Sequence, residues 1–242
     1  MNQPGDLQGF YRKAGKLAPI LMCAALALFA IGFYLASLSA RSRRGRAIPT
    51  ASSSSTFPRL GSRCRSTSSW AICSIVGLVR NSQLAYILAQ ADAPTGALMG
   101  FIALFSGAFW GRPTWGTYWV WDARLTSMLI LFFLYLGFIA LHSAIDDKRR
   151  ADRAASVISI VGAVNVPIIY FSVRWWNTLH QGASITSRGS SIADIMLYTI
   201  FIMLAAGTLY GAGVVLSRAR TMILERQRRS AWVQKTALEG KL

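Results

Sequence analysis

The sequence predicts an all-α protein that crosses a membrane several times. Hydrophobic residues make up 53% of the 242 residues, charged residues only 14%, and the mean hydropathy is +0.40. A soluble domain usually carries about 25% charged residues, whereas a helix that spans the bilayer needs about 20 mostly apolar residues in a row. Several such runs occur here, so we expect a polytopic helical bundle.

Six transmembrane helices are expected, five of them from long apolar runs. The first run is too long for the apolar part of a signal peptide and ends at a poor cleavage site, so we interpret it as a membrane helix. The second helix in chain order, Trp70–Val79, is apolar but too short to cross alone, and we regard it as degraded. The five long runs are Leu17–Leu38, Ala93–Phe109, Ala123–His142, Ala154–Ser172 and Ile192–Leu216.

The net charge of +17 first suggests a nucleic-acid-binding protein. Most of the positive residues, however, lie between or after apolar runs, where they set membrane orientation. We therefore expect no nucleic-acid partner and a multi-pass inner-membrane protein. The N-terminal segment (residues 1–16) and the basic tail (residues 217–242) are expected in the cytoplasm, on either side of a membrane domain (residues 17–216).

Residues 40–68 do not fit this orientation. They should form an outer loop, yet they contain seven arginines, no acidic residue and a hydroxyl-rich tract from Ser52 to Thr56. Such a composition is typical of low-complexity disorder, and a nucleic-acid-binding arm would lie on the wrong side of the membrane. Out-of-frame translation of GC-rich DNA yields the same mixture, so a local frameshift is a third interpretation.

Residues 110–122 are the most informative stretch and are expected to form an outer loop. Tyr118 and four of the eight tryptophans lie here. One or two tryptophans would indicate an interfacial belt, but this density, together with Gly111, Pro113 and Gly116, favours a turn-rich loop that forms a rigid, flat, apolar shelf. The four tryptophans are Trp110, Trp115, Trp119 and Trp121.

Such a shelf suits a large planar ligand, and porphyrin is the obvious biological candidate. Arg112 is a candidate partner for a propionate, because guanidinium–carboxylate hydrogen bonds are strong and directional. The same arginine could instead extend to the membrane interface, and the two interpretations stay open. Asp122 is expected to cap the next helix, with Arg124 pairing with it or with a lipid headgroup.

The second outer loop, residues 173–191, carries Trp175, Trp176 and His180. A lone histidine is more often structural than a ligand. This one is expected on the same face as the tryptophan shelf, and imidazole is the usual protein ligand of haem iron. His180 is therefore the candidate axial ligand, with the tryptophan pair beside it. His142, expected at the opposite face, is interpreted as an interfacial residue.

Several stretches resemble a known family. WGRPTWGTYWVWDARLTS is similar to the WWD signature of haem-handling membrane proteins. LFFLYLGFIAL, the pair Asp146-Asp147 and VNVPIIYFSVRWWNTLHQ resemble more narrowly the CcmC family, also called haem exporter protein C, of the bacterial cytochrome c maturation system. The resemblance runs from about Ile75 to Leu216.

The resemblance implies six transmembrane helices and haem b carried as cargo at the outer face, held on the tryptophan loop by two outer-loop histidines. It also implies transfer of haem to the chaperone CcmE, alongside CcmD and the CcmAB transporter. His180, in WNTLHQ, matches the second-loop ligand. The first ligand of the family lies in a His-Val-Pro motif before the second helix, whereas this chain has no histidine before His142. The missing position falls in or beside residues 40–68.

The function expected from the sequence is that of a haem-binding assembly factor and not of an enzyme. A transmembrane haem transporter is the first alternative; it ranks lower because no charged residue lines the predicted spans in a way that demands a polar path. A structural membrane subunit without a ligand is the second alternative. Cys23, Cys64 and Cys73 form neither CxxC nor CxxCH, which argues against a thiol oxidoreductase and against covalent haem attachment.

Overall fold

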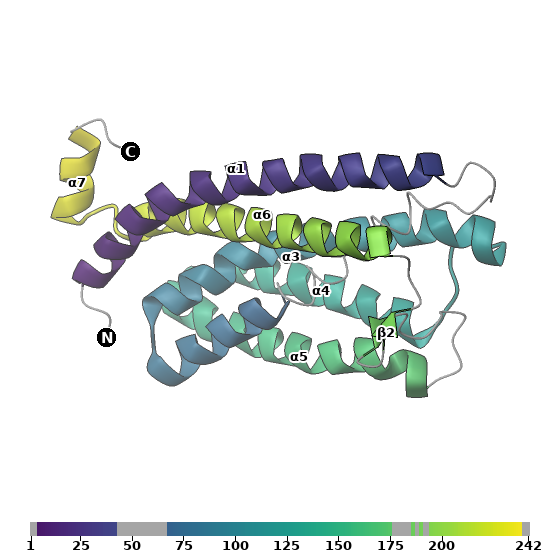
Figure 1. Cartoon of the computed structure of the whole chain (residues 1–242). Helices are drawn as coiled ribbons and strands as arrows, with labels where there is room; N and C mark the ends of the chain where they lie inside the picture. Colours follow the sequence, from purple (N-terminus) through teal and green to yellow (C-terminus); the bar gives the residue numbers. More distant parts are fainter. Residues whose placement is uncertain (1–3, 43–66, 176–184, 187–188, 191–193, 239–242) are drawn as a thin grey trace.

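The computed structural model describes residues 4–42, 67–175, 185–186, 189–190 and 194–238. Nearly all of them are helical, which confirms the all-α prediction (Figure 1). The helices are α1 (Pro4–Ser42), a helix over residues 67–80, α3 (Gln83–Trp115), α4 (Ala123–Ala144), α5 (Lys148–Trp175), α6 (Asp194–Arg226) and α7 (Ala231–Leu238). Two strands of two residues each, β1 (Ile185–Thr186) and β2 (Gly189–Ser190), pair antiparallel between α5 and α6.

Five of these helices are long and apolar enough to cross a membrane, as predicted. Their membrane-spanning portions are Leu7–Ser37, Gln83–Pro113, Ala123–Ala144, Lys148–Ile169 and Leu197–Arg226. The helix over residues 67–80 is shorter; at a rise of 1.5 Å per residue its described part extends for about 21 Å, against about 30 Å for the hydrocarbon core. The chain is therefore a multi-pass membrane protein, and we call the helix over residues 67–80, whose described part is shorter than the other spans, the reduced helix.

Several helices extend beyond the predicted apolar runs. α3 begins at Gln83 instead of Ala93, and α6 continues to Arg226 instead of ending at Leu216. A hydropathy pattern ends a span where polar residues begin, but a helix continues as long as its polar side chains find partners inside the bundle. Asp92, for example, is buried within α3 although it lies just outside the predicted run.

The helices form two pairs that α3 joins. α1 packs along α6, α4 packs along α5, and α3 packs against both α4 and α6 (Figure 1). Glycines allow the close approach of α1 and α6, because a Cβ atom at Gly32 would lie 3.0 Å from Cγ of Met203, and one at Gly213 would lie 2.8 Å from Cγ of Met22. Small residues at such contacts are typical of helix packing in membranes.

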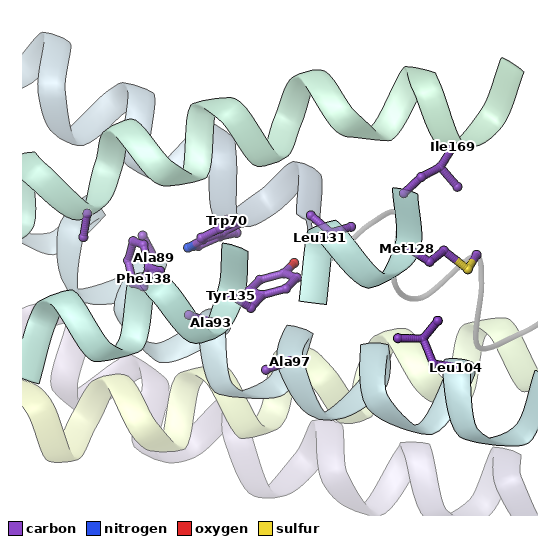
Figure 2. Packing of buried hydrophobic residues seen from close by; sticks show 11 residues of the cluster. Trp70, Ala89, Ala93, Ala97, Leu104, Met128, Leu131, Tyr135, Phe138 and Ile169 are labelled. Carbon is purple, nitrogen blue, oxygen red and sulfur yellow. The ribbon is translucent and has the colours of Figure 1, made fainter. Parts of the chain in front are cut away.

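The main core lies between the helix over residues 67–80, α3, α4 and α5 (Figure 2). Trp70 and Tyr135 are fully buried and stack with their ring centroids 4.3 Å apart, and Phe138 meets Trp70 edge-on at 5.1 Å. The hydroxyl groups of Thr67 and Tyr135 share a hydrogen bond of 2.9 Å. The reduced helix is thus anchored to α4 by its first described turn.

A buried amide fastens α5 to α4. Asn165 donates a hydrogen bond of 2.7 Å from its side-chain nitrogen to the backbone carbonyl of Ser127, and its side chain is buried. The hydroxyl of Ser127 in turn donates to the carbonyl of Ala123 at 2.6 Å. Interhelical hydrogen bonds of this kind contribute to helix association where no water competes for them. The contact fixes the first turn of α4, which follows the aromatic stretch.

Candidate functional site

The antiparallel order of the helices gives the bundle two distinct ends. α3 ends, α4 begins, α5 ends and α6 begins at one end, which we call the aromatic end because residues 110–122 lie there (Figure 1). The start of α1, the connection between α4 and α5 (residues 145–147) and α7 lie at the opposite end, which we call the basic end (Figure 1). The aromatic stretch, the end of α5 and the start of α6 therefore lie at the same end of the molecule.

The first half of the aromatic stretch is helical, which corrects the prediction of a loop from residue 110 onwards. Trp110, Arg112 and Trp115 lie in the last turns of α3, and Pro113 lies inside the helix. A proline removes one backbone hydrogen bond, and neighbouring structure can compensate for that loss within a membrane protein. Only residues 116–122 form the loop itself.

The helix ends at Gly116 for a local reason. Its φ angle of 79° lies in the left-handed region, which glycine adopts without steric cost. Its backbone N–H donates a hydrogen bond of 2.9 Å to the carbonyl of Arg112, a common way to close a helix. Gly116 therefore sets the direction in which the chain leaves α3 toward the exposed rings.

Tyr118 and Arg112 contact each other across this turn. The guanidinium of Arg112 donates a hydrogen bond to the Tyr118 hydroxyl, and its Cζ atom lies 4.8 Å from the centre of the Tyr118 ring. Phe109 meets the same ring edge-on, with centroids 6.0 Å apart. Among the described residues, the hydrogen-bond partner of this guanidinium is Tyr118. A guanidinium has five N–H donors, so the remaining donors of Arg112 can bind an anion.

Trp119 and Trp121 form the second part of the loop surface. Their rings meet edge-on, with centroids 5.7 Å apart and planes at 77°. Trp119 is partly buried against the main core, and its indole nitrogen donates to no residue that the structure describes. Trp121 is 77% exposed. The exposed indole of Trp121 therefore rests on the ring of Trp119, which packs against the main core.

Asp122 caps α4, as predicted. Its Oδ1 atom accepts a hydrogen bond of 2.7 Å from the backbone N–H of Arg124, and its carbonyl accepts one of 2.9 Å from Thr126. The side chain is buried although it is acidic. The cap fixes the end of the loop to α4, so both ends of the segment 116–122 are attached to helices.

The structure brings together only part of the predicted site. Trp175 is the last residue of α5, whereas Trp176 and His180 lie outside the described residues, so their roles stay predictions. His142 lies at the basic end, away from the aromatic stretch, as predicted. Its side chain is buried because the last turn of α4 packs on α5, and its Nε2 atom lies 3.6 Å from Oδ1 of Asp152.

Two buried carboxylates were missed in the sequence. Asp92 in α3 accepts a hydrogen bond from the hydroxyl of Ser69, and Asp152 in α5 is paired with Arg226 of α6 at 2.8 Å. Asp92 lies inside α3 only because the helix begins ten residues before the predicted apolar run. The available signal was an isolated acidic residue, within apolar sequence for Asp92 and within basic sequence for Asp152. Such residues inside membrane helices usually have a defined partner.

The described part of the aromatic end suits one kind of ligand. Exposed aromatic rings offer flat apolar surface, and a guanidinium beside them can pair with a carboxylate at the edge of that surface. A planar, apolar molecule with acidic substituents matches both features. The fold and this surface together define a polytopic helical membrane protein with a tryptophan-rich ligand platform as its candidate site.

Comparison with known proteins agrees with this class. Residues 2–234 match the family model described as CcmC, Heme exporter protein C. The chain is 44% identical over 226 residues to Heme exporter protein C of Bradyrhizobium diazoefficiens, covering 91% of this chain and 84% of the relative. The corresponding protein of Haemophilus influenzae is 40% identical over 237 residues, covering 94% and 93%. That of Escherichia coli is 46% identical over 171 residues, covering 71% and 69%.

The chain belongs to the CcmC family. The family match extends beyond the range of about Ile75 to Leu216 that carries the sequence motifs, and it includes α1 and the first half of α7. It also includes residues 40–68, so the unusual composition of that segment lies inside a chain that is otherwise typical of its family.

Proposed function

We propose that this protein binds haem b as cargo at the aromatic end and presents it at the periplasmic face for transfer to the haem chaperone CcmE. Relatives that carry the name Heme exporter protein C support a role in haem handling. The observation that carries the proposal is the exposed aromatic pair, Tyr118 and Trp121, beside the guanidinium of Arg112. It offers haem an apolar face and a cation for a propionate.

Each residue of the aromatic end has a proposed task. Tyr118 and Trp121 contact the porphyrin and exclude water, and Arg112 pairs with a propionate. Asp122 holds the loop on α4, and His180 binds the iron. The remaining tryptophans line or support the same surface; these are Trp110, Trp115, Trp119, Trp175 and Trp176.

The proposed orientation follows from the distribution of charge. The basic end carries Arg12, Lys13 and Lys16 on α1, with Arg149 and Arg150 at the start of α5. Positive residues of short loops stay in the cytoplasm. We therefore place both termini in the cytoplasm of a bacterium, the bundle in the inner membrane and the aromatic end in the periplasm. CcmD and the CcmAB transporter are the proposed partners in that membrane.

The missing first-loop histidine limits what this chain offers the iron. As written, the sequence supplies His180 alone, and a single imidazole is expected to hold haem more weakly than two. We propose that a local frameshift within or beside residues 40–68 has removed a His-Val-Pro motif. The DNA across residues 40–74 is expected to regain that motif when one small insertion or deletion is reversed. A continuous frame without such a solution would contradict the frameshift.

Transport of haem across the membrane is the second candidate function. The buried carboxylate of Asp92 is the feature that bears on it, because charged groups inside membrane helices often mark a pathway. Asp92 accepts a hydrogen bond from Ser69, however, and Asp152 is paired with Arg226. These groups form local contacts between helices, so presentation of haem without translocation remains our first proposal.

The absorption spectrum of the detergent-purified protein tests haem binding. The parent protein is expected to show a Soret band, and His180→Ala is expected to lose it or to regain it only with added imidazole. Trp121→Ala is expected to lower haem occupancy, whereas the control Trp232→Ala, which changes a tryptophan at the basic end, is expected to leave it unchanged. A parent protein without haem would favour the structural subunit. Haem flux into liposomes with this protein alone would favour the transporter.

A further inference from the structure

A largely buried polar cluster links four helices at the basic end, and we call it the clasp. It consists of Gln90 in α3, His142 in α4, Asp152 in α5 and Arg226 in α6. Arg226 donates two parallel hydrogen bonds of 2.8 Å to the carboxylate of Asp152, and its Nη2 atom also donates to Oε1 of Gln90 at 2.8 Å. The imidazole of His142 lies against the same carboxylate at 3.6 Å.

Burial distinguishes this ion pair from an ordinary surface pair. The side chains of Asp152 and Arg226 are 4% and 11% exposed, whereas those of the neighbouring pair Asp147 and Arg150 are 55% and 85% exposed. Removing one partner of a buried pair leaves an uncompensated charge in a medium of low dielectric constant, which is far more costly than the loss of a screened surface pair. The clasp therefore resists separation of the helices that contribute to it.

The clasp lies between the two helix pairs. α1 packs along α6 and α4 packs along α5, so the bond from Arg226 to Asp152 ties one pair to the other. At the aromatic end, α4 begins directly after residues 116–122, and α6 begins directly after the segment that contains His180. The angle between α6 and the pair α4–α5 thus affects the distance between residues 116–122 and the first turn of α6.

We propose that Asp152 and Arg226 are positioning residues, which set the distance between residues 116–122 and the first turn of α6 from the opposite end of the bundle. The bidentate geometry fixes both the distance and the direction of α6 relative to α5. Gln90 extends the same constraint to α3, the helix that ends in Arg112 and Trp115. The inference deepens the proposed function, but the spacing itself can be measured without haem.

Two spin labels test the spacing directly. Thr117→Cys in the loop and Ile195→Cys in the first turn of α6 are both exposed, and they are introduced after Cys23, Cys64 and Cys73 have been replaced by serine. Distances between the labels are measured by pulsed electron paramagnetic resonance in lipid nanodiscs without haem. Asp152→Asn and Arg226→Gln are expected to broaden the distribution or to move its mean by roughly 2–5 Å, the scale of shifts between packed helices.

Matched variants separate positioning from general destabilisation. Asp147→Asn removes the exposed pair and is expected to leave the distance distribution unchanged. The exchange Asp152→Arg with Arg226→Asp restores opposite charges and is expected to narrow the distribution again. Gln90→Leu removes one hydrogen bond and is expected to change the distance distribution less than the charge variants do. It replaces a charge variant that fails to fold. Parent-like distances in all folded variants of the clasp would overturn the proposal.

The haem spectrum of the same variants distinguishes this inference from the proposed function. Loss of haem together with an altered distance supports both. An altered distance with unchanged haem occupancy supports the clasp and contradicts the assignment of haem to the aromatic end. Loss of haem with a parent-like distance contradicts the clasp.

Discussion

At the scale of single residues, Arg112 and Tyr118 restrict each other. A free arginine side chain has many rotamers, and binding a ligand with it costs the entropy of that freedom. Here the guanidinium already lies against the Tyr118 ring and donates to its hydroxyl, so much of that entropy has been lost before a ligand arrives. The favourable contact between an arginine and the face of a ring adds to this order.

Asp122 provides a prediction at the same scale. Asp122→Ala removes the hydrogen bond that caps α4 and is expected to lower the free energy of unfolding by about 1 kcal/mol. Asp122→Asn keeps an acceptor at the same position and is expected to have almost no effect, because asparagine caps helices as well as aspartate. Thermal unfolding of the purified variants, followed by circular dichroism, measures both.

The two substitutions also separate capping from charge. Equal destabilisation by alanine and asparagine would mean that the negative charge of Asp122, and not its cap, stabilises the protein. Reduced haem occupancy in Asp122→Asn at unchanged stability would give the carboxylate a direct role in the site.

Roles that depend on neighbours in sequence were predictable, whereas roles that depend on distant partners were not. The cap at Asp122 follows from its place directly before an apolar run. The pairing of Asp152 depends on a helix far away in sequence, since Arg226 lies 74 residues from it, and the burial of His142 depends on how α4 packs on α5. Nothing in the local pattern around either residue specifies such a partner.

At the scale of helices, α3 shows why hydropathy and turn propensity underestimate a helix. Gly111 and Pro113 favour turns in isolation, yet the helix continues through both and ends at Gly116. Inside a membrane an unpaired backbone group costs several kcal/mol, so the helical state is retained wherever geometry permits. The sequence placed a turn in the aromatic stretch but did not indicate the residue at which helix gives way to loop.

Gly162 is a sensitive point in the packing of helices. A Cβ atom at Gly162 of α5 would lie 2.8 Å from Cζ3 of Trp70, whose ring is fully buried and stacked on Tyr135 (Figure 2). Gly162→Ala is therefore expected to destabilise the protein by about 1–3 kcal/mol through overpacking. Circular dichroism of the protein in detergent, as the temperature rises, gives the midpoint of unfolding.

Gly107 is the matched control for this substitution. A Cβ atom there meets nothing within 4 Å, and the residue lies inside α3. Gly107→Ala is expected to be neutral or to stabilise the helix by up to about 1 kcal/mol, because alanine is the better helix former. If Gly162→Ala unfolds at the same temperature as Gly107→Ala, the reduced helix does not pack on α5 through Trp70.

At the scale of the whole molecule, the proposed site requires that its two segments face the same compartment. Thr117→Cys and Ile195→Cys are expected to react with a membrane-impermeant maleimide applied from the periplasm, whereas Arg149→Cys is expected to react only after the membrane is permeabilised. These positions are exposed and lie at the aromatic end and the basic end, respectively. Labelling of Thr117 and Ile195 from opposite sides would rule out a shared binding surface.

The number of long spans was predictable from hydropathy, but their arrangement was not. Apolar runs located five membrane helices and one reduced helix. The packing of the first helix on the last large one, α1 on α6, depends on small residues such as Gly32 and Gly213 that meet only after folding. Sequence spacing carries no direct signal for such a contact across the whole chain.

The length of α1 has a mechanical consequence. With 39 residues, this helix is about 58 Å long at 1.5 Å per residue, nearly twice the thickness of the hydrocarbon core. Its N-terminal part contacts Arg220 of α6 and Trp232 of α7 through Tyr11 at the basic end. Tilting such a rod by about 5° displaces its far tip by about 5 Å. A partner protein that binds the N-terminal part of α1 outside the bilayer would thereby displace the opposite end of the helix without entering the lipid.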